Sequence, residues 1–347
     1  MTPRSVPRTD LRRYATANAR ARTLLCRLLG REGLEALYSY PSRTAMLEML
    51  ARTPYGPALL LHPGTEYGFG ARLIEVGVSI LGFLSGVEAE FIRTLLLRYE
   101  LENLKLVIRA VHHRHPWTEI EPHVQPLGEL ATLDPRALAA AADLQELAVR
   151  LGNTVYDTAA VSALPGVETA GSFALESALE IDYYERLWST AGRLQSDDAA
   201  RAQALLGLLF DLLNLTWIAR FRDALARSRE EILNYTLRQG RWVTGTVRTA
   251  LAESPLGVWR ALDRTPYAPL FGEAEELSPD LAIAKLWRVI AMEVERGFRV
   301  YPFHIGVPLG LLLAQEIEIR DLRVLLAAKT LALAPEAAFE RVATVRA

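Results

Sequence analysis

The stretch YELENLKLVIRA, residues 99–110, has two related copies further along the chain, FDLLNLTWIAR at 210–220 and IEIRDLRVLLA at 317–327. Each copy carries an acid, then an amide or second acid three residues later, then a leucine directly after it. The acid and its partner share one helical face, because positions i and i+3 are neighbours on a helix surface. These positions are Glu100, Asn103 and Leu104, then Asp211, Asn214 and Leu215, then Glu318, Asp321 and Leu322.

A second pattern recurs in the same order as the first. The pattern Leu-x-x-Thr-x-Tyr occurs at 50–55, 151–156 and 262–267, each time before one of the acid-bearing stretches. The three acids are spaced by 111 and 107 residues, which is the size of a domain and far longer than a solenoid repeat. Two landmarks repeated in one order predict that the chain is triplicated. The tyrosines of this second pattern are Tyr55, Tyr156 and Tyr267.

Helical periodicity dominates the chain. In each copy, apolar residues recur at i, i+3 and i+7 beside the polar pair, which is typical of the core stripe of a packed helix. Alternating strand patterns are almost absent, so the predicted fold class is all-α. The longest expected helices cover residues 11–29, 71–112 with a break near 82–86, 173–194, 199–227, 281–297 and 309–333.

The length of the chain agrees with several structural units. Its 347 residues exceed the roughly 250–300 at which a single hydrophobic core stops growing. Units of about 110 residues lie within the usual size range of domains. We therefore expect three similar helical units, at residues 1–122, 123–238 and 239–347.

Composition indicates an ordinary globular protein. Half of the residues are hydrophobic and the formal net charge is −2, so charge suggests no nucleic-acid partner. Cys26 is the only cysteine, and a single cysteine favours a reducing compartment. We interpret Cys26 as a small core residue. The N-terminus lacks an apolar signal region, and the best membrane candidate, 204–219, is shorter than about 20 residues and carries two polar signature residues. Any contact with a membrane is therefore expected to be peripheral.

Three histidines resemble a metal site at first sight. His112, His113 and His115 lie close to Glu119 and Glu121. The sequence has no His-Glu-x-x-His and no paired cysteines, and histidines at a helix end more often interact with terminal carbonyls. We therefore predict no metal site there.

Two further patterns have structural explanations. The glycines Gly64, Gly68 and Gly70 lack the lysine and the preceding strand of a phosphate-binding loop, so a turn is the better interpretation. Asp197 and Asp198 follow a helix break, and we interpret them as a helix N-cap. The sequence predicts no catalytic residue and no cofactor.

The repeated polar residues have two possible roles. They could line a central cavity and contact a partner, or they could fasten the turns of their own unit, with the repeated tyrosines as hydrogen-bond partners. The structural role is favoured, because buried polar groups need partners and because residues kept in all three units suit a fold better than an asymmetric ligand. The set is Tyr55, Glu100, Asn103, Tyr156, Asp211, Asn214, Tyr267, Glu318 and Asp321.

Several motifs together resemble the C-type stalk component of V-type and archaeal-type (V/A-type) rotary ATPases, a family related to the d component of the eukaryotic vacuolar ATPase. The resemblance rests on 98–104 and 313–323, on the Leu-x-x-Thr-x-Tyr turns, and on Tyr183-Tyr184 and Gly240-Arg241. It covers nearly the whole chain. The sequence departs from the family at Asp321, where asparagine is usual, and the middle acid and amide lie in an unusually apolar stretch.

The resemblance implies a fold and a function. The expected fold has three similar helical units around a pseudo-threefold axis and the shape of a funnel. The expected function is that of a non-catalytic central-stalk subunit, peripheral at the cytoplasmic face of the membrane, which joins the rotor shaft subunits D and F to the proteolipid ring. Two alternatives remain at this point. One is an all-α enzyme with its site in the cavity between units, using the histidines of 112–115 or the paired acids, and the other is a cytosolic helical adaptor.

Overall fold

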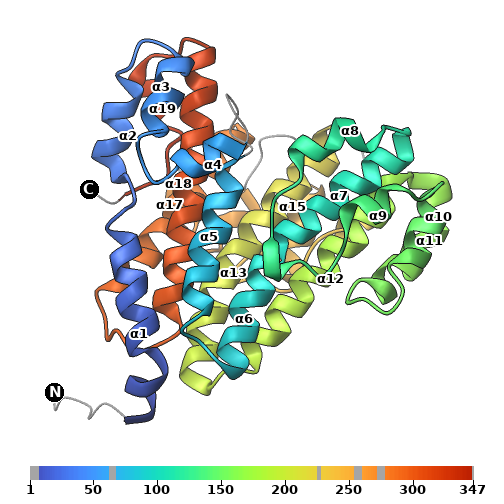
Figure 1. Cartoon of the computed structure of the whole chain (residues 1–347), viewed down its shortest axis with the longest axis horizontal. Coiled ribbons are helices and arrows are strands. Elements are labelled where there is room, and N and C mark those ends of the chain that lie inside the picture. The colour runs from blue at the N-terminus through green and yellow to red at the C-terminus, as the bar shows by residue number, and fades with distance from the viewer. Residues whose placement is uncertain (1–7, 62–67, 225–227, 254–259, 272–277, 346–347) are drawn as a thin grey trace.

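Helices make up all of the regular structure in the part of the chain that can be described. The computed structural model describes residues 8–61, 68–224, 228–253, 260–271 and 278–345 (Figure 1). Within those ranges no strand is found, which confirms the all-α prediction.

Three long helical hairpins form the body of the molecule. In the first hairpin, α5 (Phe69–Leu81) is followed by α6 (Gly86–Leu96), and the chain continues after Leu97 as α7 (Arg98–His113). The second hairpin consists of α12 (Ser172–Gly192) and α13 (Ser196–Ala219). The third consists of α17 (Pro279–Phe298) and α18 (Gly306–Thr330). Each copy of the acid-bearing stretch lies on the second arm of its hairpin.

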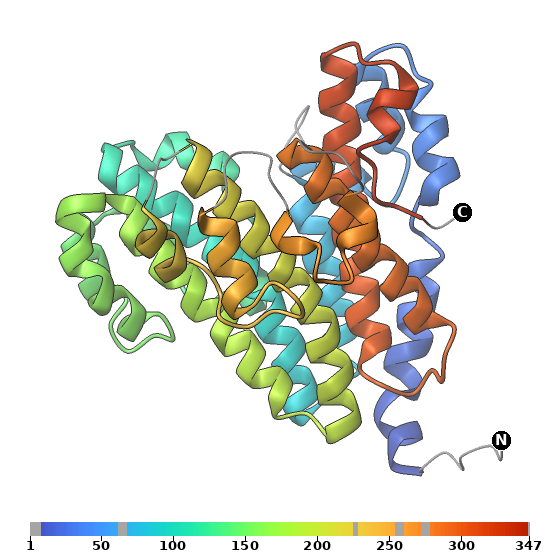
Figure 2. The same cartoon turned by 180° about the vertical axis from the view of Figure 1, so that it is seen from behind.

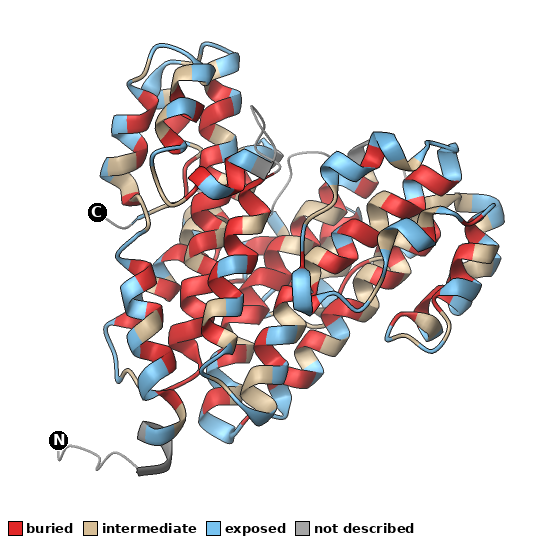
Figure 3. Ribbon diagram, viewed as in Figure 1, coloured by how far each residue is buried: buried red, intermediate tan, exposed pale blue. Residues whose placement is uncertain are grey.

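The hairpins pack on one another in a cycle. The first arm of each hairpin lies against the second arm of the preceding one: α12 packs on α6 and α7, α17 packs on α13, and α5 packs on α18. The buried residues of these helices form one continuous hydrophobic core, seen as red bands on their inner faces (Figure 3). The last hairpin therefore contacts the first, although the two are far apart in sequence.

Shorter helices form clusters at the outer ends of the second arms. In Figure 1, α2, α3 and α19 lie beside the end of α18, and α9, α10 and α11 lie on the opposite side of the molecule, beyond α7. Figure 2 brings the cluster that follows α13 to the front. The helices of these clusters are α2 (Gly30–Tyr38), α3 (Arg43–Leu50), α4 (Gly56–Leu61), α8 (Trp117–Ile120), α9 (Pro135–Ala139), α10 (Leu144–Arg150), α11 (Asp157–Ala170), α14 (Arg229–Asn234), α15 (Gly245–Glu253), α16 (Ala268–Phe271) and α19 (Pro335–Phe339).

Helix α1 (Arg8–Leu25) contacts all three hairpins near their turns. Arg13 forms an ion pair of 3.1 Å with Glu88 at the start of α6, and the Tyr14 hydroxyl donates to Asp198 at the start of α13. The Asn18 amide donates to backbone carbonyls of the α17–α18 turn. One N-terminal helix thus fastens the turn end of the molecule, by which we mean the end that carries the three hairpin turns.

Four details differ from the sequence-based expectations. The first helix ends at Leu25 instead of reaching Gly30, which has a positive φ of 66° and begins α2. A helix, α4, occupies the start of the segment that was expected to be a loop after Tyr55. Cys26 is exposed, so its interpretation as a core residue is wrong, because it lies in the turn after α1 and not on a packed face. The fourth concerns Asp197 and Asp198: they lie in the first turn of α13 and not at its N-cap, which is Gln195.

Among the described residues, one helix is long and apolar enough to be compared with a membrane span. It covers Ser196–Arg222, and 72% of its most apolar window is buried inside the protein. Its apolar surface is therefore used by the packing of α13 against α12, α17 and α18.

Candidate functional site

The nine repeated polar residues are all buried. None is more than 3% exposed, and the six acids and amides among them lie on the second arms of the hairpins. Burying a polar group without a hydrogen-bond partner is costly, so each must be satisfied inside the protein. The exposed fractions are 2% for Tyr55, Glu100, Tyr267 and Glu318, 3% for Asn103, and 0% for Tyr156, Asp211, Asn214 and Asp321.

Each tyrosine donates to an acid, and the pairing follows the same cycle as the helices. The Tyr156 hydroxyl lies 3.1 Å from Glu100 Oε1, and the Tyr267 hydroxyl lies 2.7 Å from Asp211 Oδ2. Each of these tyrosines therefore bonds the acid of the copy before it. The cycle closes when Tyr55, near the N-terminus, donates to Glu318 Oε1 at 2.8 Å. We call these pairs the first, second and third carboxylate nodes, in the order Glu100–Tyr156, Asp211–Tyr267 and Glu318–Tyr55.

The pattern Leu-x-x-Thr-x-Tyr forms the same turn in all three places. The threonine hydroxyl donates to the carbonyl of the leucine three residues earlier and accepts the backbone N–H of the tyrosine, a local motif that competes with continued helix. This turn fixes the start of each tyrosine side chain, so its hydroxyl can reach the buried acid. The hydroxyl-to-carbonyl distances are 2.6 Å for Thr53, 2.5 Å for Thr154 and 2.7 Å for Thr265, and the accepted N–H is at 3.2 Å in each.

Backbone N–H groups complete the nodes. Glu100 accepts from the N–H groups of Thr132 and Leu133 and from the Thr132 hydroxyl. Asp211 accepts three consecutive N–H groups, those of 241–243, each at 2.9 Å. The third node differs in that its N–H donors come from the N-terminal part of the chain. Glu318 Oε2 accepts from Leu29 at 2.6 Å and from Gly30 at 3.2 Å.

The second position of the repeat holds a returning loop. The Asn103 amide accepts the N–H of Gln125 at 2.7 Å and donates to its carbonyl at 2.8 Å, and Asn214 makes the same two-way pair with Leu237. In the third copy Asp321 has no N–H to donate. Its carboxylate accepts instead from the N–H groups of Ala343 and Thr344.

The Thr344 hydroxyl and the Arg320 guanidinium also donate to the Asp321 carboxylate. Asp321 therefore accepts from other donors than the asparagines of the first two copies. This explains how aspartate is accommodated where the two other copies have asparagine.

The third node has an unusual protonation equilibrium. Burial raises the pKa of Glu318 to about 7, and the hydrogen bonds from Tyr55, Gly30 and Leu29 counter this only in part. Burial also raises the pKa of Asp211, against four hydrogen bonds that favour its ionised form. Burial and the neighbouring carboxylate raise the pKa of each node tyrosine, so all three phenols remain neutral donors.

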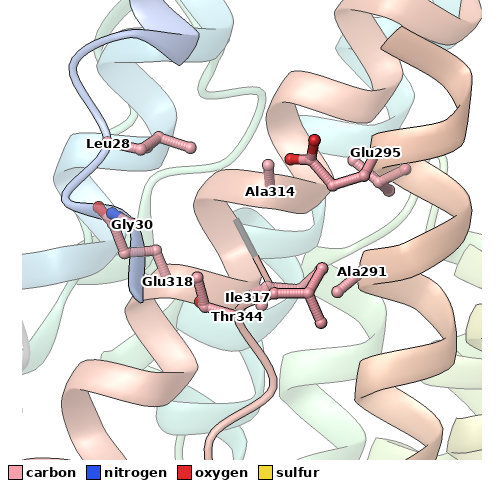
Figure 4. A pocket seen from close by; sticks show the side chains of 10 residues that line it. Leu28, Gly30, Ala291, Glu295, Ala314, Ile317, Glu318 and Thr344 are labelled. Atoms are coloured by element: carbon pink, nitrogen blue, oxygen red, sulfur yellow. The ribbon is translucent and has the colours of Figure 1, made fainter. Parts of the chain in front are cut away.

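A small hollow lies beside the third node. It is lined by Leu28 and Gly30 from the N-terminal segment, by Ala291 of α17, and by Glu318 of α18, with the segment of Thr344 along one side (Figure 4). Its volume is about 30 Å³, which is room for little more than one water molecule. The two ends of the chain therefore pack closely around this carboxylate.

A second hollow lies where the three copies meet. Arg98, Leu209 and Glu316 each stand two residues before the acid of their copy, and all three line this central hollow. Arg98 Nη1 pairs with Glu316 Oε1 at 2.9 Å, and this carboxylate raises the pKa of Arg98 well above its usual value. The volume of the hollow is again about 30 Å³. Arg98 and Glu316 were not predicted from the sequence as site residues, although their equal offset from the repeated acids could have indicated them.

The three histidines lie close together at the end of α7, with ring centroids 4.8 Å apart for His112 and His113 and 6.1 Å apart for His113 and His115. His112 and His113 are exposed, and His115, in the loop between α7 and α8, contacts Glu119, with 2.9 Å between Nδ1 and Oε2. In the described ranges, no group of three or more histidine, cysteine or acidic residues is arranged to hold a metal ion. Gly64 lies outside the described residues, while Gly70 is buried beside Tyr99 and Gln125.

The chain is similar to known proteins over most of its length. The family model described as ATP synthase (C/AC39) subunit matches residues 17–341. The chain is 26% identical over 332 residues to the C subunit of the A-type ATP synthase of Methanothermobacter thermautotrophicus, covering 93% of this chain and 86% of that protein. It is 24% identical over 343 residues to the C subunit of the A-type ATP synthase of Methanocaldococcus jannaschii, covering 94% and 85%. The C subunit of the V-type ATP synthase of Deinococcus radiodurans is 27% identical over 184 residues, covering 49% and 51%.

Proposed function

The chain belongs to the ATP synthase (C/AC39) subunit family, and from this premise we propose that it is a non-catalytic central-stalk subunit of a V/A-type rotary ATPase. In this role it couples the rotor shaft subunits D and F to the membrane proteolipid ring. It lies at the cytoplasmic face of the membrane and is held there by the ring, during rotary transport of protons or sodium ions.

The cyclic packing of the three hairpins is the observation that supports this proposal. Each hairpin contacts the next, and the third contacts the first. Equivalent residues of all three copies converge on the central hollow, as expected for units related by a pseudo-threefold axis. A part with three similar units around an axis can stay coaxial with a ring while it turns, and the proposed funnel shape would receive the shaft at one end.

The carboxylate nodes suit the transmission of torque. Each node joins one copy to the next, so a twisting load on one hairpin passes to the others through buried hydrogen bonds as well as through apolar contacts. In the proposed units 1–122, 123–238 and 239–347, every tyrosine–acid bond crosses from one unit to its neighbour. We assign a structural role to the nine repeated residues, and we place partner contacts at positions where the copies differ.

The rival enzyme hypothesis has less support from the geometry. The central hollow is lined by the Arg98–Glu316 pair, tyrosines and leucines, and its volume of about 30 Å³ is too small for a substrate. The nodes are likewise filled by their own hydrogen bonds. A coupling role therefore accounts better for the buried polar residues than a catalytic one.

The direct test is co-purification of the tagged chain from gently solubilised membranes of its host. We expect rotor-shaft and proteolipid subunits to be recovered with it, and a chaotrope wash to release the tagged chain while the ring stays in the membrane. A tagged chain found wholly in the soluble fraction of an active membrane preparation, without ATPase partners, would contradict the proposal and favour a cytosolic adaptor.

A further inference from the structure

Helix α1 is an addition to the cycle of hairpins and not a part of it. The three hairpins contact one another directly, and the hydrogen bonds described for the three carboxylate nodes all come from residues outside Arg8–Leu25. The N-terminal donors of the third node, Leu29 and Gly30, come after α1 has ended. The cycle can therefore stay closed when α1 is not in place.

Helix α1 nevertheless joins all three hairpins at the turn end. Besides its contacts to the starts of α6 and α13 and to the α17–α18 turn, it reaches the first arms of two hairpins. Arg20 Nε donates to the Ser79 hydroxyl of α5 at 2.7 Å, and Arg22 donates to the Phe298 carbonyl at the end of α17 at 3.1 Å. About three turns of one helix thus carry contacts to every hairpin.

These contacts are mostly polar. Between Arg13 and Arg22 the apolar side chains that α1 buries are Tyr14, Ala17 and Ala21. Alanine buries little apolar surface, and hydrophobic stabilisation grows with that surface. Hydrogen bonds to the turns are replaced by hydrogen bonds to water when the helix leaves, so each adds little net stability. Helix α18, by contrast, buries large apolar residues along most of its length. Undocking α1 therefore costs less free energy than separating a hairpin.

The connection behind α1 is suited to such a movement. Cys26 and Arg27, directly after the helix, are exposed, whereas the backbone N–H groups of Leu29 and Gly30 are held by Glu318. A short, exposed link thus separates α1 from a segment that is fixed on the third hairpin.

Docked α1 covers buried polar groups of the turn end. Asp198, at the start of α13, is 7% exposed and accepts from the Tyr14 hydroxyl at 2.5 Å and from the Ile305 N–H at 3.0 Å. The Asn18 amide covers backbone carbonyls of the α17–α18 turn. Without α1 this carboxylate and these carbonyls would face water, so the surface of the turn end depends on whether the helix is docked.

We infer that α1 is a detachable strap. It docks and undocks as one unit while the cycle of hairpins stays closed, which gives the turn end a strapped state and an open state. In the strapped state one helix holds the three hairpin turns together. In the open state Asp198 and the carbonyls of the α17–α18 turn are accessible. This inference does not depend on the proposed role in the rotor.

Hydrogen exchange of the full chain, followed by mass spectrometry, tests the strap. A segment that opens by itself exchanges its hydrogen-bonded amides faster than segments that open only on global unfolding. We expect the amides in the second half of α1 to exchange at least about a hundredfold faster than those in the middle of α18. Equal protection of the two helices would show that α1 opens only with the whole molecule, and would overturn the inference.

Two matched tyrosine variants separate local from global opening. Tyr14→Phe removes the hydroxyl that bonds Asp198, and should accelerate exchange in α1 by about tenfold to a hundredfold, as expected for a hydrogen bond to a charged group. Tyr183→Phe removes a hydroxyl that donates to the Leu95 carbonyl between two hairpins. That bond stays intact when only α1 opens, so Tyr183→Phe should accelerate exchange in α18 by about fivefold and leave α1 unchanged. Acceleration of α1 by Tyr183→Phe would contradict a separate opening of the strap.

A variant on the other side of the interface distinguishes undocking from fraying of a terminal helix. Glu88→Gln, on α6, breaks the ion pair with Arg13 without changing the sequence of α1. It should accelerate exchange in α1 by about two- to fivefold. The control is Glu35→Gln, which breaks the ion pair with Arg31 inside α2 and should leave α1 unchanged. If Glu88→Gln has no effect on α1 either, the helix frays without reference to the hairpins and is not a strap.

Discussion

The first two carboxylate nodes and the third are built from the same residue types but from different parts of the chain. In the first and second nodes, the tyrosine follows its acid by 56 residues in both cases. In the third node, 263 residues separate Tyr55 from Glu318. Counted among the described residues, Glu100 and Asp211 each accept four hydrogen bonds, and Glu318 accepts three.

The difference shows how a triplicated chain closes on itself. Two nodes are completed by the segment that follows in sequence, whereas the third is completed by the N-terminal segment. Further contacts join the same two segments, since the Tyr38 hydroxyl donates to the Leu333 carbonyl at 2.8 Å and Lys329 Nζ donates to the Tyr38 carbonyl at 2.6 Å. Burial dominates the pKa of Glu318 in this closing node, as it also does that of Asp211 in the second node.

The largest expected effect comes from emptying one of the well-satisfied nodes. Asp211→Ala leaves three buried backbone N–H groups and the Tyr267 hydroxyl without their acceptor, so we expect the free energy of unfolding to fall by about 4 kcal/mol. Chemical denaturation of the purified chain measures it. Tyr267→Phe, which removes one hydroxyl from the same node, is the control and should cost about 1 kcal/mol. Equal effects of the two variants would contradict the idea that the acid organises the node.

The pH dependence of stability should reveal the titration of the carboxylate in the third node. Glu318 binds its proton more tightly in the folded protein, because its pKa rises from 4.5 to about 7. Its stabilising contribution is therefore complete below about pH 4.5 and is lost as the pH rises through about 7. Relative to Glu318→Gln, which cannot titrate, the wild-type chain should lose about 3 kcal/mol between about pH 5 and about pH 8.

The measurement is chemical denaturation of both chains across that pH range. Other titrating groups, including Asp211 and His304, are common to both chains and cancel in the difference. Glu100→Gln is the matched substitution in the first node. It also replaces an acceptor oxygen by an amide, but at a node that does not join the N-terminal segment to the last hairpin. Parallel pH profiles for wild type and Glu318→Gln would show that Glu318 does not titrate in this range.

The exchange of asparagine and aspartate at the second repeat position tests a smaller difference. Asn103→Asp loses the donor to the Gln125 carbonyl, and Asp321→Asn places an amide against the N–H groups of Ala343 and Thr344. Each change leaves a mismatched polar pair and should reduce the free energy of unfolding by about 2 kcal/mol, which chemical denaturation measures. If Asp321→Asn were stabilising, the third copy would be able to adopt the two-way pairing of the other two.

The smallest expected effect compares the tyrosines of two nodes. Tyr55→Phe and Tyr156→Phe each remove one hydroxyl, and each should cost about 1 kcal/mol of unfolding free energy. Tyr55 also accepts from the Gln315 amide at 2.6 Å, so its loss leaves two buried groups unpaired and should be the larger of the two. Thermal unfolding of the two variants under the same conditions shows which of them loses more stability. The reverse order would mean that Gln315 finds another partner.

Much of the local architecture could be predicted from the residues. The i, i+3 and i+7 pattern around Leu101, Leu104 and Ile108 predicted a packed helix, and all three side chains are buried in α7. The helix break near 82–86 was also predicted, and the structure places the α5–α6 turn there. These features depend on neighbours within a few residues, which a single sequence displays directly.

Other features could not be predicted in that way. Cys26 was expected in the core and is exposed, because its position depends on where α1 ends and how the next turn leaves it. The Arg98–Glu316 pair joins two copies 218 residues apart, and nothing local to either residue marks the other as its partner. The hollow lined by Asp198, Arg201 and His304 likewise arises from two turns that are distant in sequence, those before α13 and α18.

The sequence by itself determined that the chain is helical and which polar residues recur in three related stretches. Only the tertiary structure decided that each tyrosine bonds the acid of the copy before it, and that Tyr55 closes the cycle on Glu318. The physical reason lies in the range of the interactions. Helix formation and turn chemistry are set by residues a few positions apart, whereas the pairing of buried carboxylates depends on how the last hairpin packs against the first.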